Sequence, residues 1–351
     1  MIFLPILYMC VLGACKEEKL RTMLELFSES QPLSEKRDWH INDDSLGVAS
    51  GLVCDGKNLI VYDVHSGTNY TLFDEGTGKY IARFGTIGQG PTELSSECYR
   101  YHLSRGSFFV CDNQVRAILK FNPDALRNGK ANADPICLAR YKIPEASIST
   151  LIAMDDSTYV CAGLYQPRYQ FWLFDKNNKV LDHAVDVYNA TDSSFNVHTK
   201  ALANQGEMVM HPQKKMFAYA TRLSSNIDFF EVVDHKIKLI KSLHLGDPIL
   251  KSEVEGDDTM FSASPTEDTQ IGFFSLCATD KYVYALYTEN KVYESSIKSN
   301  TVLVFDWEGN PVKKYILDKK AAAIAVDEAR QNLFATVLNK EDGWSIICYV
   351  L

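Results

Sequence analysis

From residue 45 onward, short apolar runs alternate with turn residues along the chain, and stretches of helical periodicity are scarce. The segment Ser50–Phe84 divides into four such runs, which are joined by Asp-Gly or other glycine-containing turns typical of β-hairpins. The runs are Gly51–Cys54, Leu59–Tyr62, Tyr70–Phe73 and Lys79–Phe84. Short runs separated in this way predict a four-stranded antiparallel sheet.

The same unit recurs along the rest of the chain, with four further complete units and a last one of three runs. The second and third units are predicted at Tyr99–Leu103, Ser107–Cys111, Ala117–Phe121 and Ile136–Tyr141, then Thr150–Ala153, Thr158–Cys161, Gln170–Phe174 and Val180–Val187. The fourth and fifth are predicted at Glu207–Met210, Met216–Ala220, Ile227–Val233 and Ile237–Leu243, then Phe273–Ala278, Tyr282–Tyr287, Thr301–Phe305 and Val312–Ile316. The sixth holds Ala322–Val326, Leu333–Val337 and Trp344–Val350.

Repeated four-stranded units of about 45–55 residues are typical of propeller blades. The sixth unit lacks a fourth strand, which either Met23–Phe27 or Trp39–Ile41 is available to supply. Pairing a strand from each end of the chain closes a ring and covers edges that would otherwise invite aggregation. The sequence therefore predicts an all-β fold, a six-bladed β-propeller over residues 45–351 with its last blade closed by an N-terminal strand.

The N-terminus begins with an apolar run, Ile2–Gly13, which changes abruptly to charged residues at Lys16. About a dozen residues are too few to span a hydrocarbon core of about 30 Å as a helix, so the run is typical of a cleaved secretory signal. Its ending, LGAC, resembles the lipobox of bacterial lipoproteins, in which the cysteine thiol receives the lipid. We interpret residues 1–14 as a lipoprotein signal peptide, Cys15 as the lipidation site, and residues 15–44 as a tether that includes the closing strand.

The segment Arg83–Leu94 (RFGTIGQGPTEL) carries a family likeness. A phenylalanine that closes a strand, followed by Gly-x-x-Gly-x-Gly-Pro-x-Glu, resembles the loop after the first blade in the TolB-like six-bladed propeller lipoproteins of Bacteroidetes. The charged KEE after Cys15 also resembles the signal that sends lipoproteins of these bacteria to the cell surface. The resemblance implies a propeller fold and a surface-exposed location in the outer membrane, and it implies no particular reaction.

The chain of 351 residues carries 36 Lys and Arg against 45 Asp and Glu, a net charge of −9. This excess of acid argues against nucleic-acid binding, which requires a basic surface for phosphates. None of the nine cysteines has C-x-x-C spacing, and beyond Cys10 and Cys15 several lie within apolar runs. We therefore expect buried thiols that pack as small hydrophobic groups, in place of a disulfide framework or a zinc site.

In a propeller, the loops between second and third strands and the crossovers between blades surround the central channel. Arginine and aromatic residues there suit recognition of sugars or carboxylates by stacking and bidentate hydrogen bonds, although each is alternatively an ordinary solvated loop residue. The candidates are Tyr165, Arg168, Tyr169, Arg222, Arg116 and Tyr293. With no catalytic residue and no cofactor predicted, the sequence favours a binding or scaffolding propeller for a glycan or an envelope protein, attached to the membrane by its lipid.

A second hypothesis is an enzyme, because calcium-dependent lactonases and arylesterases also use six-bladed propellers. Calcium takes several oxygen ligands at about 2.3–2.6 Å. The residues that could supply them in the central channel are Asp63, Asp112, Asn113 and Glu289. Neither the zinc-hydrolase pattern H-E-x-x-H nor the serine-hydrolase pattern G-x-S-x-G occurs in the chain. Hydrolysis that EDTA abolishes and calcium restores would distinguish this hypothesis from a binding protein.

Overall fold

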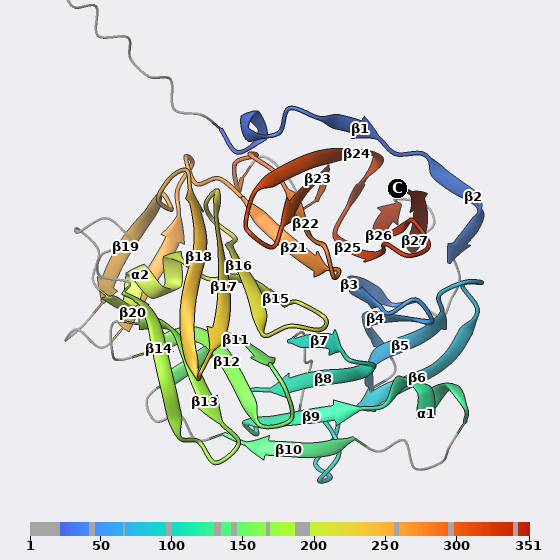
Figure 1. Ribbon diagram of the computed structural model, residues 1–351, viewed down its shortest axis with the longest axis horizontal. Helices are drawn as coiled ribbons and strands as arrows, with labels where there is room; N and C mark the ends of the chain where they lie inside the picture. Colours follow the sequence, from blue (N-terminus) through green and yellow to red (C-terminus); the bar gives the residue numbers. More distant parts are fainter. Residues whose placement is uncertain are drawn as a thin grey trace, which may run out of the picture.

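The computed structural model describes residues 22–41, 46–65, 67–95, 100–129, 135–141, 146–165, 169–186, 197–255, 260–293, 298–339 and 343–351. Their strands form six blades arranged in a ring around a central axis, as Figure 1 shows. Within each blade, neighbouring strands are antiparallel, and the chain runs from an inner strand outward. The predicted six-bladed propeller is confirmed.

The blades follow one another in chain order. Blade 1 holds β3 (Val48–Cys54), β4 (Asn58–His65), β5 (Thr68–Asp74) and β6 (Tyr80–Thr86), and blade 2 holds β7 (Tyr101–Ser104), β8 (Ser107–Asp112), β9 (Ala117–Phe121) and β10 (Ile136–Arg140). Blade 3 holds β11 (Ala146–Ala153), β12 (Thr158–Tyr165), β13 (Tyr169–Asp175) and β14 (Val180–Asp186), and blade 4 holds β15 (Gly206–Met210), β16 (Met216–Thr221), β17 (Asn226–Val233) and β18 (Lys236–His244). Blade 5 holds β21 (Phe273–Ala278), β22 (Tyr282–Tyr287), β23 (Ser299–Asp306) and β24 (Pro311–Ala321). Blade 6 holds β25 (Ala323–Asp327), β26 (Asn332–Asn339), β27 (Gly343–Val350) and, from the N-terminus, β2 (Glu35–Ile41).

Strand β2 closes the ring by pairing antiparallel with β27, where Ile41 lies opposite Ile346. Of the two segments predicted for this role, Trp39–Ile41 is therefore right and Met23–Phe27 is wrong. The latter segment holds a short 3-10 helix, η1 (Leu24–Leu26). Its flanking Met23 and Phe27 are buried between blades 4 and 5, and the Phe27 ring lies 5.2 Å from that of Phe305. Met23 and Phe27 lie one helical turn apart, so a helical turn points both side chains into the interface. Burying these two apolar side chains stabilises the fold more than pairing the segment as a strand would.

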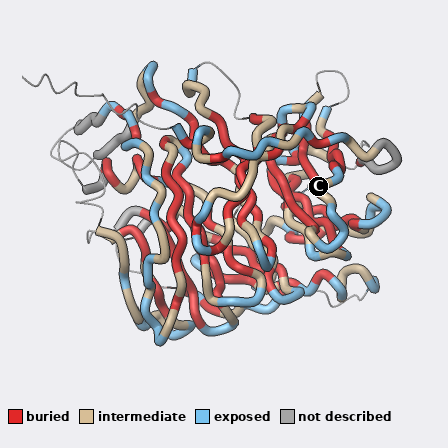
Figure 2. Tube along the Cα trace, turned by 45° about the horizontal axis from the view of Figure 1, so that its top comes forward, coloured by how far each residue is buried: buried red, intermediate tan, exposed pale blue. Residues whose placement is uncertain are grey.

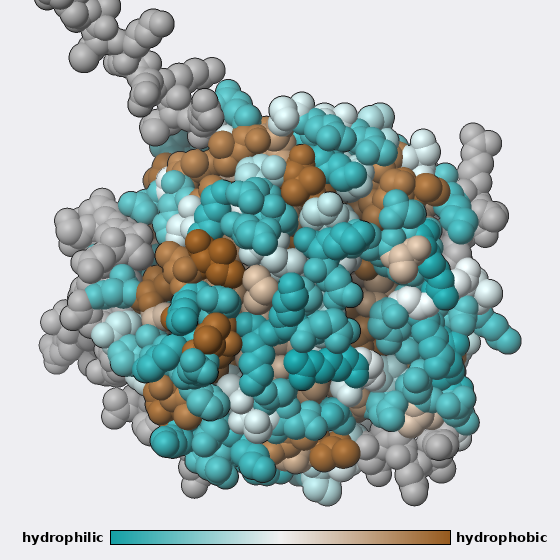
Figure 3. Space-filling view, in the orientation of Figure 1, coloured by the Kyte–Doolittle hydropathy of each residue, from teal (hydrophilic) through white to brown (hydrophobic). Residues whose placement is uncertain are grey.

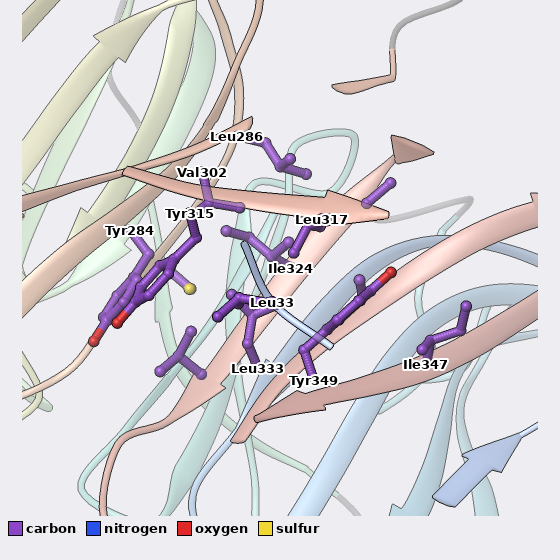
Figure 4. Close-up of a cluster of buried hydrophobic side chains, with 14 of the residues drawn as sticks. Leu33, Tyr284, Leu286, Val302, Tyr315, Leu317, Ile324, Leu333, Ile347 and Tyr349 are labelled. Carbon is purple, nitrogen blue, oxygen red and sulfur yellow. The ribbon is translucent and has the colours of Figure 1, made fainter. Parts of the chain in front are cut away.

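A strand that the sequence did not predict, β1 (Ser30–Pro32), pairs parallel with β24 and becomes a fifth strand of blade 5. The next residue, Leu33, donates its amide hydrogen to the Ile316 carbonyl over 2.9 Å. Figure 4 shows the Leu33 side chain among residues of blades 5 and 6, with Leu333 and Tyr349 close to it. The N-terminal segment therefore fastens blade 5 before it completes blade 6.

Side chains fill the interfaces between blades, and each blade is buried on both faces. Along β4, Leu59 and Val61 pack with blade 6, whereas Ile60 and Tyr62 pack with blade 2. Successive residues of a strand point to opposite faces, so a continuous apolar run serves both interfaces. Figure 2 shows the consequence as buried strands with exposed turns. In Figure 3 the face seen in Figure 1 is largely hydrophilic, with separate hydrophobic patches.

Three elements depart from the plain repeat. Helices α1 (Pro123–Arg127) and α2 (Val197–Ala203) occupy connections, and a hairpin, β19 (Leu250–Glu255) and β20 (Met260–Pro265), lies between blades 4 and 5. The sequence did not predict this hairpin, because its strands are short and mostly polar. In the part of the chain that the structure describes, no helix is long and apolar enough to cross a membrane.

The cysteines that the structure describes are free thiols. Cys111, Cys161, Cys277 and Cys348 are buried, as expected for small hydrophobic groups. Cys54 is half-buried, whereas Cys137 on the outer strand β10 is exposed, which the sequence did not anticipate.

Candidate binding site at the mouth of the central channel

The innermost strands of the blades surround a cavity of about 380 Å³ on the axis of the ring, lined by residues of β3, β7, β15, β21 and β25. A smaller cavity of about 170 Å³ extends toward β11 and shares Tyr101, Glu207, Met208 and Arg222 with the first. Each inner strand is the last strand of its sheet, so one of its edges has no neighbouring strand. Unpaired edges present backbone N–H and C=O groups, which suit a polar ligand.

An ion pair stands where the two cavities meet. Arg222 directly follows β16, and Glu207 lies on the neighbouring strand β15. The Arg222 Nη2 atom is 2.5 Å from Oε1 of Glu207, and the side chains are 47% and 36% exposed. The backbone N–H of Arg222 also donates to the Gln205 carbonyl over 3.0 Å, which fixes the arginine next to the start of β15. Pairs this exposed contribute little to stability.

Tyr101 of β7 lines both cavities beside this ion pair. Its ring stacks on Tyr62 with 5.9 Å between centroids, and its hydroxyl lies directly against Gly51. A Cβ at Gly51 would come within 1.7 Å of the Tyr101 Oη, so glycine is required there. Burial raises the pKa of Tyr101, and the nearby Glu207 charge raises it further. The phenol is therefore neutral and keeps its proton for donation to a ligand.

Arg100 supplies a second positive charge to the wall of the smaller cavity. Its Nε donates to the Ser149 carbonyl at the start of blade 3, which holds the guanidinium across the gap between blades 2 and 3. We use the name channel mouth for Arg100, Tyr101, Glu207 and Arg222. Two arginines and one glutamate give it a net charge of +1, within a chain whose net charge is −9.

Of the four predicted binding residues whose side chains the structure describes, only Arg222 lines either cavity. Arg168 lies outside the described residues, and Tyr165 is described only as the last residue of β12. Tyr169 packs against His183, with 3.8 Å between ring centroids. Arg116 adopts a left-handed turn with a φ of 52°, where its carbonyl accepts the Tyr141 amide hydrogen. Tyr293 is 67% exposed and donates its hydroxyl hydrogen to the Pro265 carbonyl.

Sequence reasoning missed Arg100, Tyr101 and Glu207. All three stand at or just before the start of an inner strand, where a crossover delivers the chain to the axis. The charges of Arg100 and Glu207 at these strand starts were a usable signal, because a charged residue there interrupts the hydrophobic pattern of the strand.

Two of the acids that the sequence predicted as calcium ligands bind the connecting segments between blades instead. Asp63 lies on β4, two residues before its end, with both oxygens engaged: Oδ1 accepts the Gly47 amide hydrogen over 2.6 Å, and Oδ2 accepts from Thr71 and Arg83. Asp112, at the end of β8 in the next blade, accepts from the backbone N–H and the hydroxyl of Ser95 over 2.7 and 2.6 Å. An aspartate on the second strand of each of these two blades therefore binds the connecting segment that leads into the same blade.

The other two residues of the calcium hypothesis have similar local partners. Asn113 Nδ2 donates to the Ile148 carbonyl in blade 3, and Glu289 Oε1 accepts from the Tyr287 hydroxyl over 3.1 Å. Among the described residues, no three His, Cys, Asp or Glu side chains are grouped so that they could hold a metal ion. The four predicted ligands thus lie with separate partners, and the structure does not bring them together.

A second cluster of charges lies at the other end of the strands, where blades 6 and 1 meet. Glu75, in the turn after β5, is buried, and its Oε2 accepts the Gly56 amide hydrogen over 2.7 Å. Arg330 Nη1 lies 3.3 Å from Oε1 of Glu75 and 3.6 Å from Oδ2 of Asp327. Burial, and then the adjacent Asp327 carboxylate, raise the pKa of Glu75 to about 8. We name Glu75, Asp327 and Arg330 the seam cluster.

Comparison with known proteins identifies the family. A family model described as TolB-like 6-blade propeller-like matches residues 52–329. The chain belongs to this family. A search of curated proteins finds no match.

Solved structures of the propeller type resemble this TolB-like chain at low sequence identity. A member of the DUF4221 family from Bacteroides vulgatus is 11% identical with a TM-score of 0.54, over 90% of this chain and 97% of that protein. A candidate exported protein from Bacteroides fragilis is 10% identical with a TM-score of 0.51, over 92% and 98%. Raptor from Chaetomium thermophilum is 12% identical with a TM-score of 0.51 over 94% of this chain, which spans only 30% of the length of Raptor. At these identities the likeness concerns the fold.

Proposed function

We propose that this TolB-like propeller is an exported lipoprotein that is held at the cell surface by a lipid on Cys15 and binds a glycan or an envelope protein at the channel mouth. The observation that carries the binding role is the axial cavity of about 380 Å³ with Arg222, Glu207 and Tyr101 at its entrance. Small-molecule sites are concave, of about 300–1,000 Å³, and have a few convergent polar groups. This cavity has both properties.

The location is supported by two further observations. The LGAC ending of the apolar N-terminal run resembles a lipobox, and the Bacteroides fragilis protein of the same fold is described as a candidate exported protein. Met23, eight residues after Cys15, is buried between blades 4 and 5. A lipid on Cys15 would therefore be joined to the folded ring by a tether of about seven residues, or at most about 25 Å.

Metabolic labelling with an alkyne analogue of palmitate in a bacterial host tests the tether. We expect the wild-type chain to be labelled and Cys15→Ala to be unlabelled and released from the membrane fraction. Cys137→Ala is the matched control, because it removes an exposed cysteine of the folded ring and should leave labelling intact. Labelling of Cys15→Ala at the wild-type level would refute lipidation at this residue.

Binding is tested separately on glycan arrays and by crosslinking in the envelope. Arg222→Ala should abolish capture of the ligand, whereas Arg116→Ala, which changes an arginine outside both cavities, should not. Equal loss in both variants would remove the channel mouth from the proposal.

A further inference from the structure

The channel mouth has the charge and the donors to recognise a carboxylate. Arg222 and Arg100 contribute two guanidinium groups, and Tyr101 adds a neutral phenol. A guanidinium matches a carboxylate with two parallel hydrogen bonds, which are stronger than neutral ones. The charged residues of the mouth sum to +1 although the chain as a whole is acidic, so the mouth attracts an anion.

The arginine is available to a ligand even though it is paired. Arg222 and Glu207 are both more than a third exposed, so their ion pair is screened by water and weak. An incoming carboxylate can take the place of Glu207 at small cost, because the displaced glutamate becomes solvated. Glu207 therefore acts as a competitor that occupies Arg222 until the ligand arrives.

The cavity beyond the mouth selects the rest of the ligand. Its walls combine apolar side chains, such as Met208 and Leu276, with the hydroxyl of Ser50 and the unpaired backbone edges of the inner strands. A hydrocarbon placed there would leave backbone donors and acceptors without partners, which is costly. A polyhydroxylated body would satisfy them, and a volume of about 380 Å³ is ample for a sugar ring.

We propose that the channel mouth binds a small sugar acid, with its carboxylate on Arg222 beside Arg100 and its hydroxyl-bearing ring inside the axial cavity. This inference rests on the proposed binding function and narrows its ligand to one chemical class. A uronic acid, either free or at the end of a glycan, has the required carboxylate and hydroxyl groups.

Isothermal titration of the full-length lipoprotein in detergent tests the assignment, with glucuronate as the probe and glucose and octanoate as comparison ligands. Glucuronate should bind, and glucose and octanoate should bind at least about tenfold more weakly, since each lacks one of the two recognised features. Glucose that binds as tightly as glucuronate would overturn the role of the carboxylate. Octanoate that binds as tightly would overturn the polar cavity.

Variants locate the site. Arg222→Ala should weaken glucuronate binding by about tenfold or more, and Arg222→Lys should lie between it and the wild type, because lysine keeps the charge but not the forked geometry. Arg116→Ala should bind like the wild type. Thermal melts of each variant show whether it is folded, and Arg222→Lys carries the test if the alanine variant is not.

Glu207→Gln gives the most discriminating result. It keeps the size of the side chain and removes the competing charge, so glucuronate should bind severalfold more tightly. Weaker binding in Glu207→Gln would overturn the competitor model. If a neutral glycan or an envelope protein binds instead, and Arg222→Ala abolishes that binding, the proposed function stands and the sugar-acid inference falls.

Discussion

Two clusters of acid and arginine lie at opposite ends of the blades and have different chemistry. At the channel mouth, Glu207 and Arg222 are partly exposed and form one short ion pair. At the seam cluster, Glu75 and Asp327 are buried, and the half-exposed Arg330 lies near an oxygen of each. At the mouth, a ligand can replace Glu207 as the partner of Arg222, because water then solvates the displaced glutamate. The seam cluster cannot exchange a partner in this way, because a buried carboxylate without a partner costs several kcal/mol.

Burial of the carboxyl groups, and not the identity of the residues, therefore separates a replaceable ion pair from a structural one.

The pH dependence of stability should be governed in part by Glu75. Its pKa of about 8 in the folded protein lies above the ordinary value of 4.5. Between these values the folded state holds the proton more tightly than the unfolded chain, so stability is fully present below pH 4.5 and falls as the pH rises through 8. Urea denaturation at pH 5, 7 and 9 should show this fall in the wild type and a flatter profile in Glu75→Gln.

Glu207→Gln serves as the matched control for that experiment, because it makes the same chemical change at the exposed mouth. It should keep the slope of the wild type. A Glu75→Gln profile that is parallel to the wild type would contradict the assignment of the titration to the seam.

Asp112→Ala should lower the free energy of unfolding by about 3 kcal/mol, because it removes a buried acceptor from several partly buried donors. These donors include the amide and hydroxyl of Ser95. EDTA should leave the wild-type melting temperature unchanged if this acid has a structural role. Asp156→Ala, which removes an exposed carboxylate paired with Lys120, should cost less than about 1 kcal/mol. If EDTA destabilised the wild type as much as Asp112→Ala does, the structural role would be wrong and Asp112 would be a metal ligand.

Gly51→Ala should destabilise the fold by about 2 kcal/mol, because the new methyl group overpacks the contact with the Tyr101 hydroxyl. The phenol must then move out of the channel mouth, so ligand affinity should fall as well. Chemical denaturation measures the first effect and titration the second. Gly246→Ala has open space around its new Cβ and should leave both values near those of the wild type.

Glu207→Ala should change the free energy of unfolding by less than about 1 kcal/mol, because its ion pair with Arg222 is exposed. Thermal denaturation at low and high salt is the measurement. If the free energy of unfolding fell by several kcal/mol, the ion pair at the mouth would stabilise the fold as the seam cluster does, and the two clusters would not differ.

Much of the architecture could be predicted because the strands and turns of the blades leave local patterns in the sequence. Runs such as Leu59–Tyr62 are short, apolar and bounded by turn residues, and a missing strand in the last unit pointed to the N-terminus. The choice between Met23–Phe27 and Trp39–Ile41 was beyond such reasoning. Both segments are apolar, and only the gap between blades 4 and 5 decides where Phe27 packs.

The candidate site was predicted only in part for a related reason. Arg222 was found because it follows a recognisable second strand, whereas Arg116 occupies the same kind of loop in blade 2 and lines neither cavity. Asp63 and Asp112 look like metal ligands in a sequence, yet their oxygens are used by crossovers 16 and 17 residues earlier in the chain.

The strands of the six blades, their grouping and the need for a strand from the N-terminus follow from the sequence, because hydrophobic periodicity and turn chemistry act between neighbouring residues. The tertiary structure alone brings Arg100, Tyr101, Glu207 and Arg222 to one cavity and buries Glu75 together with Asp327. These groups belong to different blades, and closure of the ring alone sets the distances and the dielectric environment that give each carboxylate its role.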